Sequence, residues 1–425
     1  MRNIFRPAGK TSFLLFLILI SPLLVHAEAR ERTLYEFGGN CWVDQQNYNL
    51  ISSLVADSKG NLYGTRYCSP MPGSGFVFQL QRNSQGSLDY KIIYAFGRRN
   101  EGVWPFGGLS VDSAGNLYGV TYEGGAYNGG VVYELTPDTS GSWHETVLWN
   151  FPSYPSKGDG CNPYAAPILD EVGNLYGTTT ACGAYYGGAA FELMRNSNGD
   201  WSETILHNFA SRLGPDGAAP NSNLVFDKSG NLYGTTPMGG QYTYGTVFEL
   251  SRGSDNTWAE TLLHQFTGGV DGSSPYGVVF DADGNLYGSN DGPLNTYTGG
   301  IVYALTPQPD ATWSETVLYT FPAWTNTLIG GPGVLSFSQK GDLYGPAGFG
   351  GPSNGGCPQG CGGIFRLVPG LGSRWIYQQI YGFTGLADGG VPMGPLVFDG
   401  KGNIYGTNNY GGTAAEGTVF QILVQ

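Results

Sequence analysis

Histidine and positive charge are scarce in this chain. Its 425 residues include four histidines, and 20 lysine and arginine residues face 33 aspartate and glutamate residues, which gives a formal net charge of -13 at pH 7. A chain this acidic offers no basic surface to a nucleic acid and is repelled by anionic lipid. We therefore expect neither a nucleic acid nor a membrane as a partner.

Long hydrophobic runs are also lacking, with one exception at the start of the chain. Residues 12–25 form an apolar run that follows Arg2, Arg6 and Lys10 and ends at Val25-His26-Ala27. This order is typical of a signal peptide, whereas the alternative, a retained membrane anchor, would need a run of about 20 residues. We predict a signal peptide over residues 1–27 and a secreted or periplasmic protein over residues 28–425.

No segment has a sustained helical period, and the regular feature is instead a repeat. The pentapeptide Gly-Asn-Leu-Tyr-Gly, or a close variant, occurs seven times, with its tyrosine at Tyr63, Tyr118, Tyr176, Tyr233, Tyr287, Tyr344 and Tyr405. Each copy contains four short apolar segments separated by Gly, Asp, Asn and Ser, which predicts four strands, A to D. In one copy these strands cover residues 222–227, 231–236, 245–250 and 258–266.

Seven such copies predict an all-β, seven-bladed β-propeller with four antiparallel strands in each blade and a single domain over residues 28–425. The two ends of the chain predict how the ring closes. The last copy stops at strand C, residues 417–425, whereas residues 31–37 resemble a strand D without a copy of its own. If this N-terminal strand pairs in the last blade, no unpaired sheet edge remains.

The six cysteines form three pairs by repeat position: Cys41 with Cys68, Cys161 with Cys182, and Cys357 with Cys361. In the first two pairs, one cysteine precedes strand A and the other follows strand B, and these two loops leave a sheet on the same face. An even number of cysteines in an exported chain favours disulfides. A zinc site is the alternative, and it is disfavoured because no histidine lies near these loops.

Catalytic chemistry has few candidate residues. Beyond residue 27 the histidines are His144, His207 and His264, all in predicted strands D. His207 and His264 take the position that Tyr94 or Trp149 has in other copies. We interpret them as sheet residues, so that a Ser-His-Asp, Cys-His or histidine-metal mechanism has no base or ligand. We predict no catalytic residue, no metal and no cofactor.

Carboxylates are the remaining acid-base candidates. An acidic residue followed by Gly-x-x-Pro precedes strand A in five copies, at Glu101, Asp159, Asp216, Asp271 and Asp388. One interpretation is an acidic ring at a mouth of the central channel, open to calcium or a basic ligand. We favour turn formation, because an aspartate before glycine hydrogen-bonds its own backbone. The aspartates of the A-to-B turns are interpreted in the same way: Asp57, Asp112, Asp170, Asp227, Asp281 and Asp399.

The D-to-A loops vary most in length and contain large aromatic residues. Our ligand-binding candidates there are Trp42, Asp44, Trp104, Tyr154, Tyr164, Tyr276 and Trp324. The B-to-C loops on the same face add Tyr122, Tyr127, Tyr185, Tyr242, Tyr297 and Tyr410. Aromatic rings with few charges suit sugar stacking or protein docking, although rings that pack between neighbouring loops would give the same composition.

The run Asp112-Ser-Ala-Gly-Asn-Leu-Tyr-Gly, followed by Tyr122-Glu-Gly-Gly and by Gly130-Val-Val-Tyr-Glu-Leu-Thr-Pro, closely resembles the GloVer (Gloeo/Verruco) tandem repeat. The resemblance covers all seven copies. It implies an exported bacterial β-propeller, often anchored at the surface, and implies no established activity or catalytic residue; this chain shows no anchor segment. A weaker likeness to kelch repeats supports the blade.

These observations favour a monomeric, secreted or periplasmic propeller that binds a polymer such as a glycan, or a protein, through its loop-rich face. A carbohydrate-active lyase or hydrolase that uses loop carboxylates is the alternative. A structural extracellular repeat protein is a third hypothesis.

Overall fold

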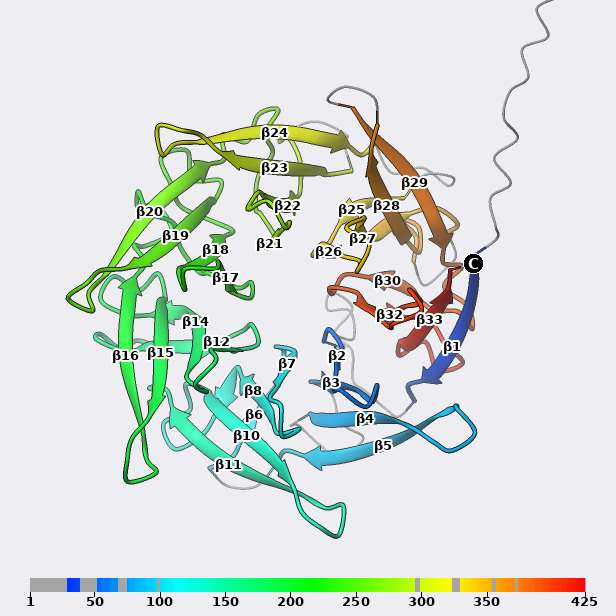
Figure 1. The fold of residues 1–425 in the computed structure, drawn as a ribbon, viewed down its shortest axis with the longest axis horizontal. Helices are drawn as coiled ribbons and strands as arrows, with labels where there is room; N and C mark the ends of the chain where they lie inside the picture. Colours follow the sequence, from blue (N-terminus) through cyan, green and yellow to red (C-terminus); the bar gives the residue numbers. More distant parts are fainter. Residues whose placement is uncertain are drawn as a thin grey trace, which may run out of the picture.

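Seven β-sheets stand around a central axis in the computed structural model of the chain, and they follow one another around a ring (Figure 1). The structure describes residues 29–38, 52–67, 75–97, 100–294, 299–322, 329–353, 357–370 and 374–424. The prediction of an all-β, seven-bladed propeller is confirmed. In this part of the chain, no helix has the length and hydrophobicity of a membrane span.

Each blade is an antiparallel meander with strand A nearest the axis and strand D at the rim. Blade 1 contains β2 (Val55–Ala56), β3 (Leu62–Arg66), β4 (Phe76–Arg82) and β5 (Leu88–Ala95). Blade 2 contains β7 (Leu109–Val111), β8 (Leu117–Thr121), β10 (Val131–Pro137) and β11 (Trp143–Asn150). Blade 3 contains β13 (Ile168–Leu169), β14 (Leu175–Cys182), β15 (Ala189–Arg195) and β16 (Trp201–Asn208). Blade 4 contains β17 (Val225–Phe226), β18 (Leu232–Thr236), β19 (Thr246–Arg252) and β20 (Trp258–Gln265).

The remaining blades follow the same order. Blade 5 contains β21 (Val278–Phe280), β22 (Leu286–Asn290), β23 (Ile301–Pro307) and β24 (Trp313–Thr320). Blade 6 contains β26 (Ser336–Phe337), β27 (Leu343–Gly350), β28 (Gly363–Pro369) and β29 (Trp375–Gly382). Blade 7 contains β31 (Val397–Phe398), β32 (Ile404–Tyr410), β33 (Thr418–Leu423) and, from the other end of the chain, β1 (Arg30–Glu36).

Strand β1 closes the ring as predicted. It pairs antiparallel with β33 from Arg30 opposite Leu423 to Glu36 opposite Thr418. The buried Arg66 of blade 1 then reaches Glu416 of blade 7 at 2.8 Å, and its guanidinium lies 4.9 Å from the centre of the Phe37 ring. A β-strand pairing and a buried ion pair therefore join the first and last blades.

The repeated pentapeptide is explained by one hydrogen-bond network in the A-to-B turn. In blade 4, Asp227 Oδ1 accepts the backbone N–H groups of Ser229 and Asn231, and Oδ2 accepts Asn231 Nδ2 and the Tyr233 hydroxyl, at 2.7 to 3.3 Å. Equivalent bonds form around Asp57, Asp112, Asp170, Asp281 and Asp399. The hairpin-turn interpretation of these aspartates is confirmed.

The glycine after the repeated tyrosine has a packing role. A Cβ atom on Gly234 would lie 2.6 Å from the ring of Phe248 in strand C and 2.9 Å from Leu224. In every other blade, the corresponding glycine would likewise bring a Cβ atom within 3.0 Å of an aromatic side chain of strand C. Only glycine lets this ring lie across strand B.

The core lies between neighbouring blades. Between blades 3 and 4, Tyr176 and Phe209 pack with Leu232 and Phe248, and none of the four is more than 3% exposed. Apolar burial of this kind is the main stabilising contribution to a propeller, because each sheet has two faces to cover.

Strand A differs from the prediction. In blade 4 the expected strand over residues 222–227 is only Val225–Phe226. Three blades instead have an additional short strand that pairs with the far end of strand B: β12 (Gly160–Pro163), β25 (Ile329–Pro332) and β30 (Gly390–Pro392). In blade 2, a separate pair of β6 (Gly102–Val103) and β9 (Glu123–Gly124) takes this place. These pairings fasten the D-to-A loop to its own blade.

Candidate ligand-binding site

Four aromatic rings surround Phe106 on the face formed by the D-to-A and B-to-C loops. The ring centres of Tyr67, Tyr122 and Tyr164 lie 5.3, 5.4 and 5.5 Å from that of Phe106, and Trp104 lies at 6.3 Å. These five rings line a pocket of about 450 Å³, which we call the aromatic pocket. Its other lining residues are Thr180, Ala219, Asn221, Pro237 and Met238, so that blades 1 to 4 all contribute.

The aromatic pocket has neutral polar groups only. Burial raises the pKa of the Tyr164 phenol, and the neighbouring Tyr122 adds to this shift. Burial also raises the pKa of Tyr67, although Arg66 opposes it. Both hydroxyls therefore remain protonated near neutral pH, where they donate and accept hydrogen bonds. None of the ten described lining residues has a carboxylate, amine or imidazole group.

Backbone contacts hold Trp104 at the edge of this pocket. Its carbonyl oxygen accepts the N–H groups of Phe106 at 2.9 Å and Tyr122 at 3.0 Å. Thr65 of blade 1 donates its hydroxyl to the carbonyl oxygens of Pro105 and Gly107 at 2.7 and 2.8 Å. The loop that contains the Trp104 and Phe106 rings is thus fixed on two sides.

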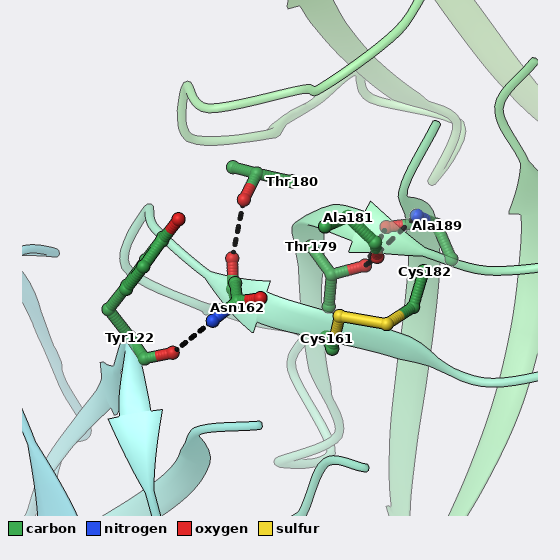
Figure 2. Close-up of a disulfide and its surroundings, with 8 residues drawn as sticks. All are labelled: Tyr122, Cys161, Asn162, Thr179, Thr180, Ala181, Cys182 and Ala189. Atoms are coloured by element: carbon green, nitrogen blue, oxygen red, sulfur yellow. Dashed lines mark hydrogen bonds between the residues drawn. A yellow bond between two sulfur atoms is a disulfide. The ribbon is translucent and has the colours of Figure 1, made fainter. Parts of the chain in front are cut away.

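A disulfide and one asparagine hold the segment that precedes Tyr164; Figure 2 shows the disulfide and the contacts of the asparagine. Cys161 of β12 is bonded to Cys182 of β14, as predicted. The side-chain amide of Asn162 donates to the backbone carbonyl of Tyr122 at 2.9 Å, and the backbone carbonyl of Asn162 accepts the Thr180 hydroxyl at 2.8 Å. Asn162 therefore links the pocket walls of blades 2 and 3.

The pocket residues share a position in the repeat. The residue before the proline of the acid-Gly-x-x-Pro motif has a positive φ in each blade where the structure describes this motif, for example 61° at Trp104 and 56° at Ala219. Positive φ is uncommon outside glycine and marks a sharp corner. The residue after the proline then turns toward the pocket, as Phe106, Tyr164 and Asn221 do.

The predicted ligand-binding residues have different positions. Trp104 and Tyr164 line the aromatic pocket, whereas Tyr154 and Tyr276 do not. Tyr154 is 62% exposed and packs edge-on against Tyr186, and the Tyr276 hydroxyl donates to Asp291. Three other candidates, Trp42, Asp44 and Trp324, lie outside the described residues, as does the predicted pair of Cys41 and Cys68.

Sequence reasoning missed Phe106, Tyr67 and Met238. A signal for Phe106 was present, because it follows the motif proline as Tyr164 does. No comparable signal marks Met238, which reaches the pocket only through the curvature of the ring. The third predicted cysteine pair, Cys357 with Cys361, is a disulfide in the structure.

The five acids of the Gly-x-x-Pro motif lie at the rim beside strand D rather than around the axis. They accept backbone N–H groups within their own loops, as Asp216 does from Ala210 at 3.0 Å and Asp271 does from Thr267 at 2.8 Å. This bonding supports the turn interpretation. Each acid also contacts an aromatic or imidazole ring of the strand D that precedes it in the chain, and it lies close to a glutamate of strand D in the next blade.

We call each such cluster of a ring, a loop acid and a glutamate a seam. Five seams are described: Tyr94, Glu101 and Glu145; Trp149, Asp159 and Glu203; His207, Asp216 and Glu260; His264, Asp271 and Glu315; and Tyr381, Asp388 and Glu31. In the remaining two interfaces a tyrosine replaces the glutamate, and the rings stack instead, Tyr35 on Tyr90 and Tyr319 on Tyr377.

Burial changes the protonation of the seam glutamates. It raises the pKa of Glu31, Glu260 and Glu315 to about 7. Burial, together with the charge of Asp159, raises the pKa of Glu203 to about 9, and burial raises that of Asp159 as well. These two carboxyl groups hydrogen-bond to each other, so that they share a proton.

The histidines are sheet residues, as expected, but they are not remote from the loops. His207 Nε2 lies 3.1 Å from Asp216 Oδ2, and His264 Nε2 lies 3.3 Å from Asp271 Oδ2. The prediction that no histidine lies near the loops was wrong, because the D-to-A loop folds back along the strand that precedes it. His144 contacts Asp138 in an exposed C-to-D turn.

Solved structures similar to this chain are distant. The extracellular domain of a putative hybrid two-component system from B. thetaiotaomicron has a TM-score of 0.50 at 12% identity, over 92% of this chain and 39% of that chain. A putative oxidoreductase (glucose dehydrogenase) from Thermus thermophilus has a TM-score of 0.44 at 16% identity, over 77% of this chain and 99% of that chain. The chain spans about two fifths of the sensor domain, and the first likeness supports the propeller fold alone.

No curated protein matches the sequence. The profile of the Gloeobacter/Verrucomicrobia repeat matches residues 145–357, which include the pentapeptides of blades 3 to 6 and the seams that follow blades 2, 3 and 4. The seven-copy pattern read from the sequence continues this repeat on both sides of the match. The chain therefore belongs to the Gloeobacter/Verrucomicrobia repeat family.

Proposed function

We propose that this propeller is an exported binding protein that holds a polymer ligand, with a glycan as the favoured class, in the aromatic pocket. The composition of the pocket supports this best: five partly exposed rings with neutral hydroxyl and amide groups between them. Flat rings cover the apolar faces of a sugar, and a few neutral polar groups set its orientation. The two described disulfides support export, because such bonds persist in oxidising compartments.

The enzyme alternative has weaker support. A glycosidase needs two carboxyl groups about 5 to 10 Å apart on either side of the bond it cleaves. Asp159 and Glu203 are a buried carboxyl pair, but they hydrogen-bond to each other inside a seam. No sugar ring fits between two groups that are in direct contact, and this favours binding over hydrolysis.

A glycan array and a reducing-sugar assay on the same sample test the proposal. We expect saturable glycan binding without release of new reducing ends. Trp104→Ala and Tyr164→Ala should each weaken this binding by about tenfold or more, since the loss of a central aromatic contact costs roughly 2 kcal/mol. Their melting temperatures should stay close to that of the parent, because both rings are partly exposed.

Tyr185→Ala is the matched control, because Tyr185 is a loop tyrosine of blade 3 that is 61% exposed and does not line the pocket. It should bind as the parent does. Sugar release by the parent would favour the enzyme instead. Absence of glycan binding, or equal losses in Tyr185→Ala and Trp104→Ala, would overturn the assignment of the aromatic pocket and leave a protein partner or a structural role.

A further inference from the structure

The seam between blades 3 and 4 brings together three side chains that are common metal ligands. His207 Nε2 lies 3.1 Å from Asp216 Oδ2 and 3.7 Å from Glu260 Oε2. One ligand atom from each of the three residues lies within 4.8 Å of the others, and no other histidine, cysteine, aspartate or glutamate trio in the described ranges does so. They come from three separate segments, β16, the D-to-A loop and β20.

These distances suit a small divalent ion. Zinc binds histidine nitrogen and carboxylate oxygen at about 2.0 to 2.2 Å in a tetrahedron, which places ligand atoms roughly 3.3 Å apart. The two separations from His207 Nε2 differ from this value by a few tenths of an ångström, and the Asp216 and Glu260 oxygens lie within 4.8 Å of each other, within reach of side-chain rotation. The side chains of His207 and Asp216 are each 21% exposed, so that a water molecule can take the fourth position.

The surroundings orient two of the three ligands. Asp216 uses Oδ1 to accept the Ala210 N–H at 3.0 Å, which leaves Oδ2 toward His207. The His207 ring packs edge-on against the Phe209 ring, with 4.7 Å between the two ring centres.

The blade itself does not need this histidine. Tyrosine takes the same place in the seams of blades 1 and 6, at Tyr94 and Tyr381, and its hydroxyl bonds to the loop acid there. In the neighbouring seam, Asp271 is more deeply buried than Asp216 and is already bonded to the backbone and hydroxyl of Thr267. Glu315 there completes no comparable trio.

We propose that His207, Asp216 and Glu260 bind one divalent transition-metal ion of the zinc class between blades 3 and 4. The ion would link two blades at the rim, on residues that the aromatic pocket does not use.

Titration calorimetry tests this proposal on the full-length, tag-free, chelator-treated protein at pH 7.5 with zinc chloride alone. We expect one saturable zinc site per chain. His207→Tyr should lower the affinity at least tenfold, because it removes one of three ligands while it keeps a residue that other seams accept. Cobalt(II) should give the visible absorption of a tetrahedral site in the parent and not in this variant.

His264→Tyr is the matched control and should bind zinc as the parent does. Glu260→Gln, which keeps the size of the side chain, gives an independent variant and should also lose at least tenfold in affinity. No saturable site in the parent would overturn the proposal. So would a Glu260→Gln variant that binds as the parent does, or a loss in His264→Tyr as large as that in His207→Tyr.

Discussion

Carboxylic acids that are buried at the seams follow a rule visible across the blades. Where the D-to-A loop supplies an acid, a glutamate lies near the start of the next strand D, as in Asp159 with Glu203. Where the loop lacks the motif, that residue is Tyr90 or Tyr377 and the interface becomes a ring stack. Asp159 and Glu203 therefore hold a proton between them, and the stability of the protein should depend on pH.

Glu203→Gln tests this dependence. The pKa of Glu203 is raised from 4.5 to about 9, so the folded protein holds this proton more tightly than the unfolded chain. The resulting stability is present below the unfolded pKa and is lost as pH rises toward the folded value. Glutamine keeps the hydrogen and cannot ionise, so the variant should gain stability relative to the parent between pH 5 and pH 8.

Urea unfolding at the two pH values measures this effect. The exposed Glu171→Gln variant is the control and should follow the parent at both. If the difference between Glu203→Gln and the parent were the same at pH 5 and pH 8, the shared proton would be absent.

In each blade, an aromatic ring of strand C packs directly against a glycine of strand B. The ring of Phe248 lies where a Cβ atom of residue 234 would be, and Leu224 closes the other side. Gly234→Ala should therefore lower the free energy of unfolding by about 1 to 3 kcal/mol, the usual effect of overpacking a core. Gly400→Ala is the control, since nothing lies within 4 Å of its Cβ position and its φ is not positive. Chemical denaturation of both compares them, and a Gly234→Ala variant as stable as Gly400→Ala would contradict the packing argument.

Sequence reasoning predicted the strands well where the period of the repeat determines them. The fixed interval from Tyr233 to Phe266 gave strands B to D, and the unmatched segment at residues 31–37 gave the closure. It failed where contacts join two blades. Nothing local to Asp216 indicates that Glu260 of the next blade lies beside it, and nothing local to Phe106 shows that Tyr67 and Tyr164 complete its pocket.

The ring as a whole depends on one pairing between the two ends of the chain. Without β1, the backbone groups of β33 would form an unpaired sheet edge, and Arg66 would lose the packing of Phe37 above its guanidinium. Deletion of residues 29–37 should therefore lower the melting temperature and cause association of chains, measured by calorimetry and light scattering.

A synthetic peptide of residues 29–37 is the control for this deletion. Added in excess, it should pair with β33 and restore the monomer, because it supplies the missing edge partner. A deleted chain that stays monomeric and as stable as the parent would contradict the role of the closure.

The closure also determines when the molecule can be finished during its synthesis. Glu36 at the end of β1 accepts a hydrogen bond from Thr413, 377 residues further along the chain. A ribosome adds roughly 5 to 20 residues each second, so β1 waits on the order of 20 to 75 s for its partner to be made. Blades 1 to 6 can form in order of synthesis during this time, while the earliest strand stays unpaired and open to chaperones. The last blade is therefore the last part of the fold that can form, and a nascent chain that is released early lacks it.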